Sequence, residues 1–245
     1  YVYAEPGTYD GDFVMDMPVL LFAQNATAPT YNADGSLKPR ENGAVINGSV
    51  TVTTQNGNIA GFDFVGDGTG TAVIDAQIVQ RCTFTNYDIA VEMERDVYNS
   101  DSPTVSNNAF VDNNTAILFG EHEWYTYLGG NTFWHNDTAM RYPSECTITG
   151  EYSPSFQAMM TRDSMIRNRF YLEDGQMVLV NDSRNQATIN LTYNYFEQAG
   201  TAKPRAAMFD GPAVYSPYYE TAAMSSVTTD ESLEDNLEES TTTSV

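Results

Sequence analysis

A short phrase of polar and aromatic residues recurs along the chain at similar intervals. It reads SNNAFVDNNTAIL at 106–118, GGNTFWHNDTAMR at 129–141, IRNRFYLEDGQMV at 166–178 and TYNYFEQAGTAKP at 192–204. QRCTFTNYDIAVE at 80–92 is a variant with Cys82 in the Asn position, and AGFDF at 60–64 is a looser copy. From Cys82 through the four asparagines the steps are 26, 23, 37 and 26 residues. Periods of this length predict a solenoid or a propeller.

Apolar and polar positions alternate in short segments within each repeat, and Gly, Asn and Asp separate these segments. The segments are rich in β-branched and aromatic residues, so we predict strands, and the longer 3.6-residue periodicity of helical repeats is absent. Three short strands in each repeat predict a three-stranded coil, with successive coils about 4.8 Å apart. The Phe of each repeat would then stack inside the core. The Asn would lie in a tight turn and hydrogen-bond to its neighbours in a ladder.

With these repeats the chain resembles the right-handed parallel β-helix proteins of the pectate-lyase-like superfamily. Its opening, VYAEPGTYDGDFVMDMPVLLFAQ at 2–24, is similar to the first coil of such domains. The resemblance covers about residues 1–210 and implies an all-β, three-sheet solenoid with 23–26 residues per coil and side-loop insertions. It says little about activity, because this fold hosts lyases, hydrolases, epimerases, adhesins and phage tailspikes.

The repeats and a change of composition after Tyr219 divide the chain into two parts. We expect residues 1–219 to form the β-helix domain and residues 220–245 to form an acidic, Ser/Thr-rich disordered tail or linker to further modules of a larger protein. The segment 225–245 has six acids and no basic or aromatic residue. Two insertions, at 27–43 and 142–160, are expected to be side loops, which in solenoids often bind ligands.

The net charge of −22 changes the list of plausible partners. Such a surface repels nucleic acid and anionic membranes, and it is common in secreted proteins, so we expect an extracellular or cell-surface location and no nucleic-acid partner. No apolar run reaches membrane-spanning length, so no membrane insertion is expected within this chain. Cys82 and Cys146 are too few for a disulfide scaffold. We expect both to be thiols, since they fall two coils apart.

Alternation also predicts which side chains point outward from the strand that follows each Asn-rich loop. The positions seven and nine after each Phe are apolar and are predicted to be core. The position between them carries Glu92, Leu118, Arg141 and Val178, which are predicted to form an outward column. By the resemblance, this face is the floor of the substrate groove in the lyases.

Aromatic residues near this column suggest a ligand groove. We predict that His122, Trp124, Tyr125 and Tyr127 form one wall and Trp134 and His135 the other, with Arg141 on the floor. Exposed aromatic rings beside carboxylates suit sugars, which offer an apolar face and hydroxyls. The alternative is that the Trp and Tyr side chains fold back and cover the coil edge. The two histidines lack a Cys partner, which favours a structural role over a metal site.

The function predicted from these features is a non-catalytic, adhesin-like module that binds a polysaccharide or cell-surface glycan. The first alternative is a polysaccharide lyase or glycoside hydrolase of the same fold, in which Arg141 is the only base candidate on the floor. Calcium is the one cofactor suggested, held by Glu92, Glu94 and Asp96; an acidic rim without metal is the alternative. The third reading is a structural stalk without ligand. Several acids, or acids with a basic residue, on the outer face of this sheet would favour the enzyme, whereas exposed stacked aromatics would favour binding.

Overall fold

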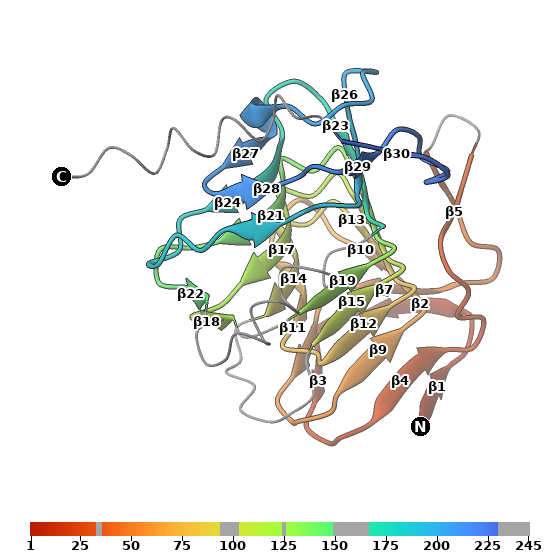
Figure 1. Cartoon of the computed structure of the whole chain (residues 1–245). Coiled ribbons are helices and arrows are strands. Elements are labelled where there is room, and N and C mark those ends of the chain that lie inside the picture. The colour runs from red at the N-terminus through yellow and green to blue at the C-terminus, as the bar shows by residue number, and fades with distance from the viewer. Residues whose placement is uncertain (33–35, 94–102, 124–125, 149–166, 230–245) are drawn as a thin grey trace.

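A computed structural model describes residues 1–32, 36–93, 103–123, 126–148 and 167–229 (Figure 1). The described chain forms a right-handed parallel β-helix of three sheets, which confirms the predicted fold class. The central coils each contribute one strand to each sheet, so parallel neighbours in a sheet come from successive coils. In the part of the chain that is described, no helix is long and apolar enough to cross a membrane.

The three sheets are named here by their number of strands. The six-stranded sheet contains β1 (Val2–Ala4), β4 (Leu20–Ala23), β9 (Asn58–Ala60), β12 (Ile78–Gln80), β15 (Thr104–Ser106) and β19 (Tyr127–Gly129). The ten-stranded sheet contains β2 (Gly7–Asp10), β7 (Ala44–Asn47), β10 (Phe62–Val65), β13 (Thr83–Thr85), β16 (Ala109–Val111), β20 (Thr132–Trp134), β23 (Arg169–Leu172), β26 (Tyr195–Gln198), β29 (Tyr218–Tyr219) and β30 (Val227–Thr228). The eight-stranded sheet contains β3 (Phe13–Met15), β8 (Val50–Val52), β11 (Thr71–Ile74), β14 (Ile89–Met93), β17 (Thr115–Phe119), β21 (Thr138–Tyr142), β24 (Met177–Asn181) and β27 (Phe209–Asp210).

Smaller elements lie outside these sheets. They are the antiparallel pair β5 (Thr30–Tyr31) and β6 (Leu37–Lys38), the parallel pairs β18 (His122–Glu123) with β22 (Thr147–Ile148) and β25 (Ile189–Asn190) with β28 (Ala213–Val214), and the 3₁₀ helix η1 (Ala206–Met208). Strand β30 pairs antiparallel with β29, so regular structure continues past residue 219. Residues 230–245, most of the predicted tail, lie outside the described residues.

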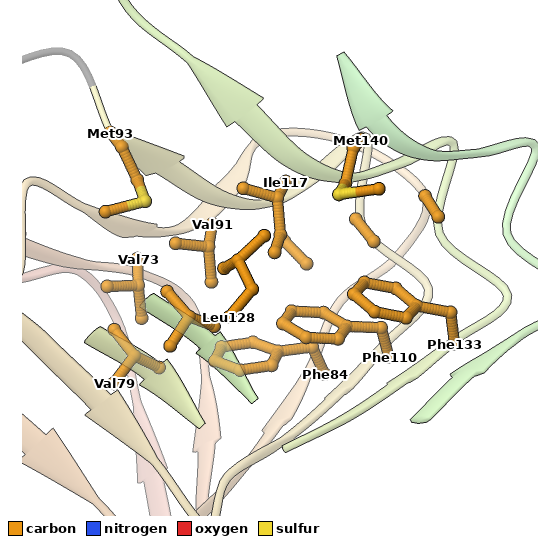
Figure 2. Close-up of a cluster of buried hydrophobic side chains, with 14 of the residues drawn as sticks. Val73, Val79, Phe84, Val91, Met93, Phe110, Ile117, Leu128, Phe133 and Met140 are labelled. Atoms are coloured by element: carbon orange, nitrogen blue, oxygen red, sulfur yellow. The ribbon is translucent and has the colours of Figure 1, made fainter. Parts of the chain in front are cut away.

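The interior contains the predicted stack of phenylalanine rings, and Figure 2 shows three of them in line. The rings of Phe84, Phe110, Phe133, Phe170 and Phe196 follow one another with centroids 4.8–5.3 Å apart. Phe64, from the looser copy, extends the stack at 4.9 Å. The parallel register places equivalent residues of successive coils side by side, so one apolar position per repeat becomes a continuous buried column.

The predicted asparagine ladder is also present. The side-chain amide of Asn108 donates to Asn131, that of Asn131 to Asn168, and that of Asn168 to Asn194, each at 3.1 Å. The Cys82 backbone amide donates to Asn108 at 2.8 Å, so Cys82 takes the first place in the ladder. These buried amides satisfy turn backbone groups that water cannot reach.

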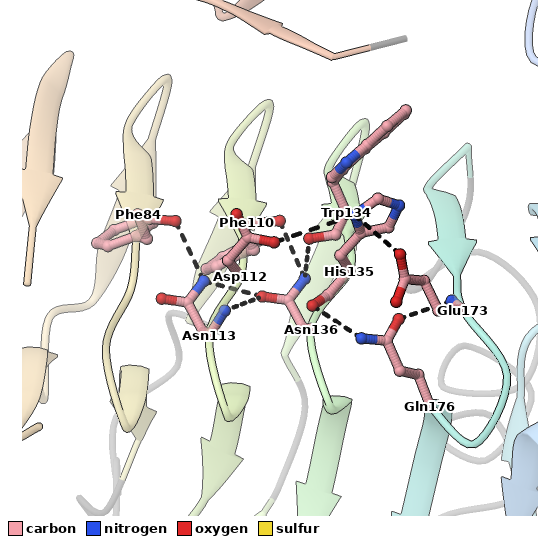
Figure 3. A network of polar contacts seen from close by, with 9 residues as sticks. All are labelled: Phe84, Phe110, Asp112, Asn113, Trp134, His135, Asn136, Glu173 and Gln176. Atoms are coloured by element: carbon pink, nitrogen blue, oxygen red, sulfur yellow. Dashed lines mark hydrogen bonds and ion pairs between the residues drawn. The ribbon is translucent and has the colours of Figure 1, made fainter. Parts of the chain in front are cut away.

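A second, shorter ladder was not predicted, although its two asparagines each stand three positions after the Phe of their repeat, Phe110 or Phe133. Asn113 donates to Asn136 at 2.8 Å and to the Phe84 carbonyl at 3.1 Å (Figure 3). Asn136 in turn donates to the Phe110 carbonyl at 2.9 Å. Both side chains are buried, so they satisfy backbone groups of this turn that water cannot reach.

The predicted outward position of Val178 is wrong. Strand β24 pairs with β21 through Thr138 with Met177 and Arg141 with Val180, so Val180 is the outward neighbour and Val178 is fully buried. The turn before β24 is two residues longer than its equivalent in the preceding coil. Gly175 at φ 89° and a 2.7 Å hydrogen bond from the Glu173 amide to the Gln176 side chain hold this longer turn.

Candidate functional site

The outer face of the eight-stranded sheet carries an outward column with one residue from each of six successive strands, β11 to β27. The register joins Ile74, Glu92, Leu118, Arg141, Val180 and Asp210 in that order. This column is the predicted floor, with Val180 in place of Val178. Its middle is mixed, because an apolar Leu118 lies between the carboxylate of Glu92 and the guanidinium of Arg141.

A shallow cavity of about 370 Å³ opens over the middle of this floor. It is lined by Asp88, Ile89, Asn114, Thr115, Leu118, Arg141, Pro143, Ser144, Glu145 and Asp182. The turns before the strands supply Asp88 and Asn114, and the segments after them supply Glu145 and Asp182. The cavity therefore crosses the whole width of the sheet, with carboxylates on both sides of one guanidinium.

The charged side chains of Arg141 and Asp182 in this cavity are exposed, so a ligand can contact them. Arg141 Nη2 lies 3.8 Å from Asp182 Oδ2, and the two side chains are 49% and 47% exposed. An ion pair this exposed contributes about 0–1 kcal/mol, so a ligand hydroxyl can replace either partner at small cost. Across the cavity, Asn114 donates to Asp88 at 2.6 Å, which fixes the direction of that carboxylate.

Asp88, Asn114, Glu145 and Asp182 were not predicted as site residues. For two of them the sequence carries a signal, because the position four after each Phe holds Asp88, Asn114 and then Asp137. A polar residue repeated at one register position forms a row along the edge of the sheet. Glu145 and Asp182 follow strands of different coils and share no repeat position.

Three of the residues predicted to share one groove lie on three different sheets. Arg141 points outward from the eight-stranded sheet. Trp134 pairs with Val111 and Tyr171 on the outer face of the ten-stranded sheet, next to the inward Phe133. Tyr127 points outward from the six-stranded sheet, and a Cβ added at Gly129 would lie 2.4 Å from its hydroxyl. The predicted convergence of Tyr127 and Trp134 on Arg141 is therefore wrong.

His135 lies in the turn between the ten- and eight-stranded sheets rather than in a groove. Its backbone has φ 54°, and its Nδ1 atom is 4.0 Å from Asp112 and 3.9 Å from Glu173 (Figure 3). Its ring lies 4.8 Å from that of Trp134, and Trp134 lies 4.7 Å from Tyr171. The predicted aromatic surface therefore exists in part, but on the outside of the ten-stranded sheet.

Four predicted residues fall outside the described residues: Trp124, Tyr125, Glu94 and Asp96. His122 is described by its backbone, which pairs with Thr147. Glu92 is described, and its carboxylate accepts a 3.3 Å hydrogen bond from Thr71. Within the described ranges no group of three or more His, Cys, Asp or Glu side chains is placed to hold a metal ion.

No similar protein indicates the function of this site, so only its geometry does. Comparisons with protein-family models, with curated proteins and with solved structures find no match for this chain. The sheet topology establishes the fold. The groups around Arg141 are the evidence for the chemistry of the site.

Proposed function

We propose that the chain is an extracellular or cell-surface module, related to the pectate-lyase-like proteins, that binds a saccharide chain across the eight-stranded sheet. One observation carries this proposal: the cavity around Arg141 combines carboxylates, an amide and hydroxyls with an apolar floor at Leu118. Sugar recognition uses such convergent polar groups beside apolar surface. An open cavity that crosses the sheet suits a chain, which enters at one side and leaves at the other.

The charge of the site favours a neutral saccharide. Three carboxylates, of Asp88, Glu145 and Asp182, surround the single guanidinium of Arg141, and the whole chain carries −22. An anionic chain would be repelled unless calcium bridged it to the acids. We therefore expect neutral polysaccharides to bind without added metal.

Cleavage of the bound saccharide is the second candidate, and a specific observation favours it. Arg141 lies within 4 Å of Asp182, in a cavity that two further acids line. A lyase needs a base and a cation to neutralise the substrate's carboxylate, whereas an inverting hydrolase needs two carboxylates about 6.5–9.5 Å apart around a water. No aromatic ring lines this cavity among the described residues, which weakens a purely stacking mode of binding.

The test is a panel of immobilised neutral and acidic polysaccharides, scored for both retention of the protein and release of soluble product. We expect retention on at least one neutral polysaccharide and its loss in Arg141→Gln. The matched control is Arg205→Gln, an exposed arginine outside the cavity, which should bind as wild type. Equal binding by both variants would place the ligand elsewhere. Product release that Asp182→Asn abolishes would favour the enzyme.

A further inference from the structure

A second cavity, of about 580 Å³, lies on the outer face of the ten-stranded sheet, whereas the Arg141 cavity lies on the eight-stranded sheet. Strands β20, β23 and β26 supply Thr132, Arg169, Tyr171 and Glu197, and two other segments add Tyr31 and Ala222. Its volume falls in the usual range of small-molecule sites. The two cavities are therefore separate candidate sites.

Arg169 gives this cavity a positive charge that no described acid neutralises. Its Nε donates to the Ala222 carbonyl at 2.8 Å, which fixes the direction of the side chain. The ion pairs among the described residues do not include Arg169, and its two terminal nitrogens make no hydrogen bond within that part of the chain. These nitrogens are available to a carboxylate, which a guanidinium can bind through two parallel hydrogen bonds.

Glu197 gives the same cavity a negative charge. One of its carboxylate oxygens, Oε2, accepts a hydrogen bond from the Tyr195 hydroxyl. Burial and this hydrogen bond raise the pKa of the Tyr195 phenol, so the phenol keeps its proton and Glu197 remains the acceptor. Glu197 takes part in none of the ion pairs between described residues, so its Oε1 is available to a cationic group.

Arg169 and Glu197 lie in neighbouring strands but do not pair with each other. The register places Arg169 opposite Tyr195 and Tyr171 opposite Glu197. One strand spacing and two residues along the strand separate the Cα atoms of Arg169 and Glu197 by about 8 Å. Both side chains are half-buried. Two opposite charges held apart in one cavity are complementary to a ligand that carries both charges.

The charge balance of the cavity disfavours simpler ligands. A simple anion would meet Glu197 beside Arg169, in a chain whose net charge is −22. A simple cation would meet the guanidinium of Arg169, and a neutral molecule would leave both charges without a counter-charge. A zwitterion offers a partner to each group and adds no net charge to the cavity.

The spacing of the two charges favours an α-amino acid among zwitterions. Such a molecule carries its carboxylate and its ammonium on one carbon atom, so two charge-assisted hydrogen bonds of about 2.8 Å can bridge side chains at this separation. The ring of Tyr171 and the methyl group of Ala222 also line the cavity, and they suit an apolar ligand side chain. The Tyr31 hydroxyl hydrogen-bonds to Thr132, so these two groups have each other as partners.

We propose that this cavity binds a free α-amino acid with an apolar side chain. Its carboxylate pairs with the terminal nitrogens of Arg169, and its ammonium pairs with Oε1 of Glu197. Its side chain packs against Tyr171. This site is independent of the saccharide site around Arg141.

The test is titration calorimetry of the full chain with L-leucine and L-phenylalanine. Each is compared with its amide, which lacks the carboxylate, and with its N-acetyl derivative, which lacks the ammonium. 6-Aminohexanoate, an isomer of L-leucine with its charges at opposite ends, tests the spacing. At least one of the two amino acids should bind about tenfold or more tighter than its amide, its N-acetyl derivative and 6-aminohexanoate.

Two variants assign the two charges. Arg169→Gln should bind the free amino acid about tenfold or more weakly and should no longer prefer it to the amide. Glu197→Gln should weaken binding to a similar extent and should no longer prefer the free amino acid to the N-acetyl derivative. A merely structural role of either residue would not remove one preference and keep the other. The matched controls Arg205→Gln and Glu220→Gln, both at exposed positions outside the cavity, should bind as wild type.

Arg141→Gln should also leave amino-acid binding intact, so a failure of the saccharide proposal can be told apart from a failure of this one. Four results would each overturn the proposal. They are no binding of either amino acid, equal affinity for the amide or the N-acetyl derivative, equally tight binding of 6-aminohexanoate, and unchanged binding by Arg169→Gln or Glu197→Gln.

Discussion

Replacing Asn131 by alanine tests the ladder that holds the coils in register. The Asn131 side chain makes four hydrogen bonds and is fully buried. Its Oδ1 accepts from the backbone and side-chain amides of Asn108 at 3.0 and 3.1 Å. Its Nδ2 donates to the Val105 carbonyl at 2.8 Å and to Asn168 at 3.1 Å.

The expected loss in the free energy of unfolding follows from the hydrogen-bonding groups that lose their partner when Asn131 becomes alanine. The buried Asn108 backbone amide loses its acceptor, at about 1–3 kcal/mol, and the other three bonds contribute about 0.5–1.5 kcal/mol each. Alanine offsets part of this because no side-chain amide then has to be buried. We expect the free energy of unfolding to fall by about 3–5 kcal/mol.

The measurement is urea denaturation followed by circular dichroism, with Asn114→Ala as the control. Asn114 is an exposed asparagine whose side chain makes a single hydrogen bond, to Asp88, so its loss should cost under about 1 kcal/mol. If Asn131→Ala and Asn114→Ala destabilise the chain equally, the buried ladder does not hold the coils together.

Three further predictions concern stability. Phe133→Ala should lower the free energy of unfolding by about 3–5 kcal/mol through the cavity it leaves in the ring stack, whereas the outward Val111→Ala should change it little; equal losses would refute the stack. Burial raises the pKa of the Cys82 thiol from its ordinary 9.0 to about 11, so stability should be complete below pH 9 and decline as the pH rises from 9 to 11. A flat denaturation profile over that window would contradict it. Removing residues 230–245 should leave the Tm unchanged, because this acidic segment has little apolar surface to bury, while removing 220–245 should lower it through loss of β30.

The fold could be predicted because its main signals recur at fixed places in each repeat. Phe and Asn keep their spacing, and parallel pairing converts that spacing into a ring stack and a ladder. The prediction failed at Val178 because the turn at Glu173–Gln176 holds two extra residues, which displaces the outward position to Val180. The alternation of apolar and polar residues does not reveal that a turn has changed in length.

The site was less predictable, for two physical reasons. Trp134 follows the inward Phe133 within one strand, so it faces out from the ten-stranded sheet before the chain turns toward Arg141. Proximity in sequence therefore did not mean a shared face. The described end of the insertion at 27–43 is held by single contacts, such as that of Arg40 with Asp63, that no periodic pattern encodes.

The central claim is that the cavity around Arg141 binds a saccharide. Its most direct test is the retention of wild-type protein, Arg141→Gln and Arg205→Gln on immobilised neutral polysaccharides, with soluble product measured in the same wells. We expect wild type and Arg205→Gln to be retained on at least one polysaccharide, and Arg141→Gln not to be retained although its Tm is unchanged. Failure of the wild-type protein to bind any polysaccharide, or equal retention of Arg141→Gln, would contradict it and favour a structural stalk or a ligand site on another face.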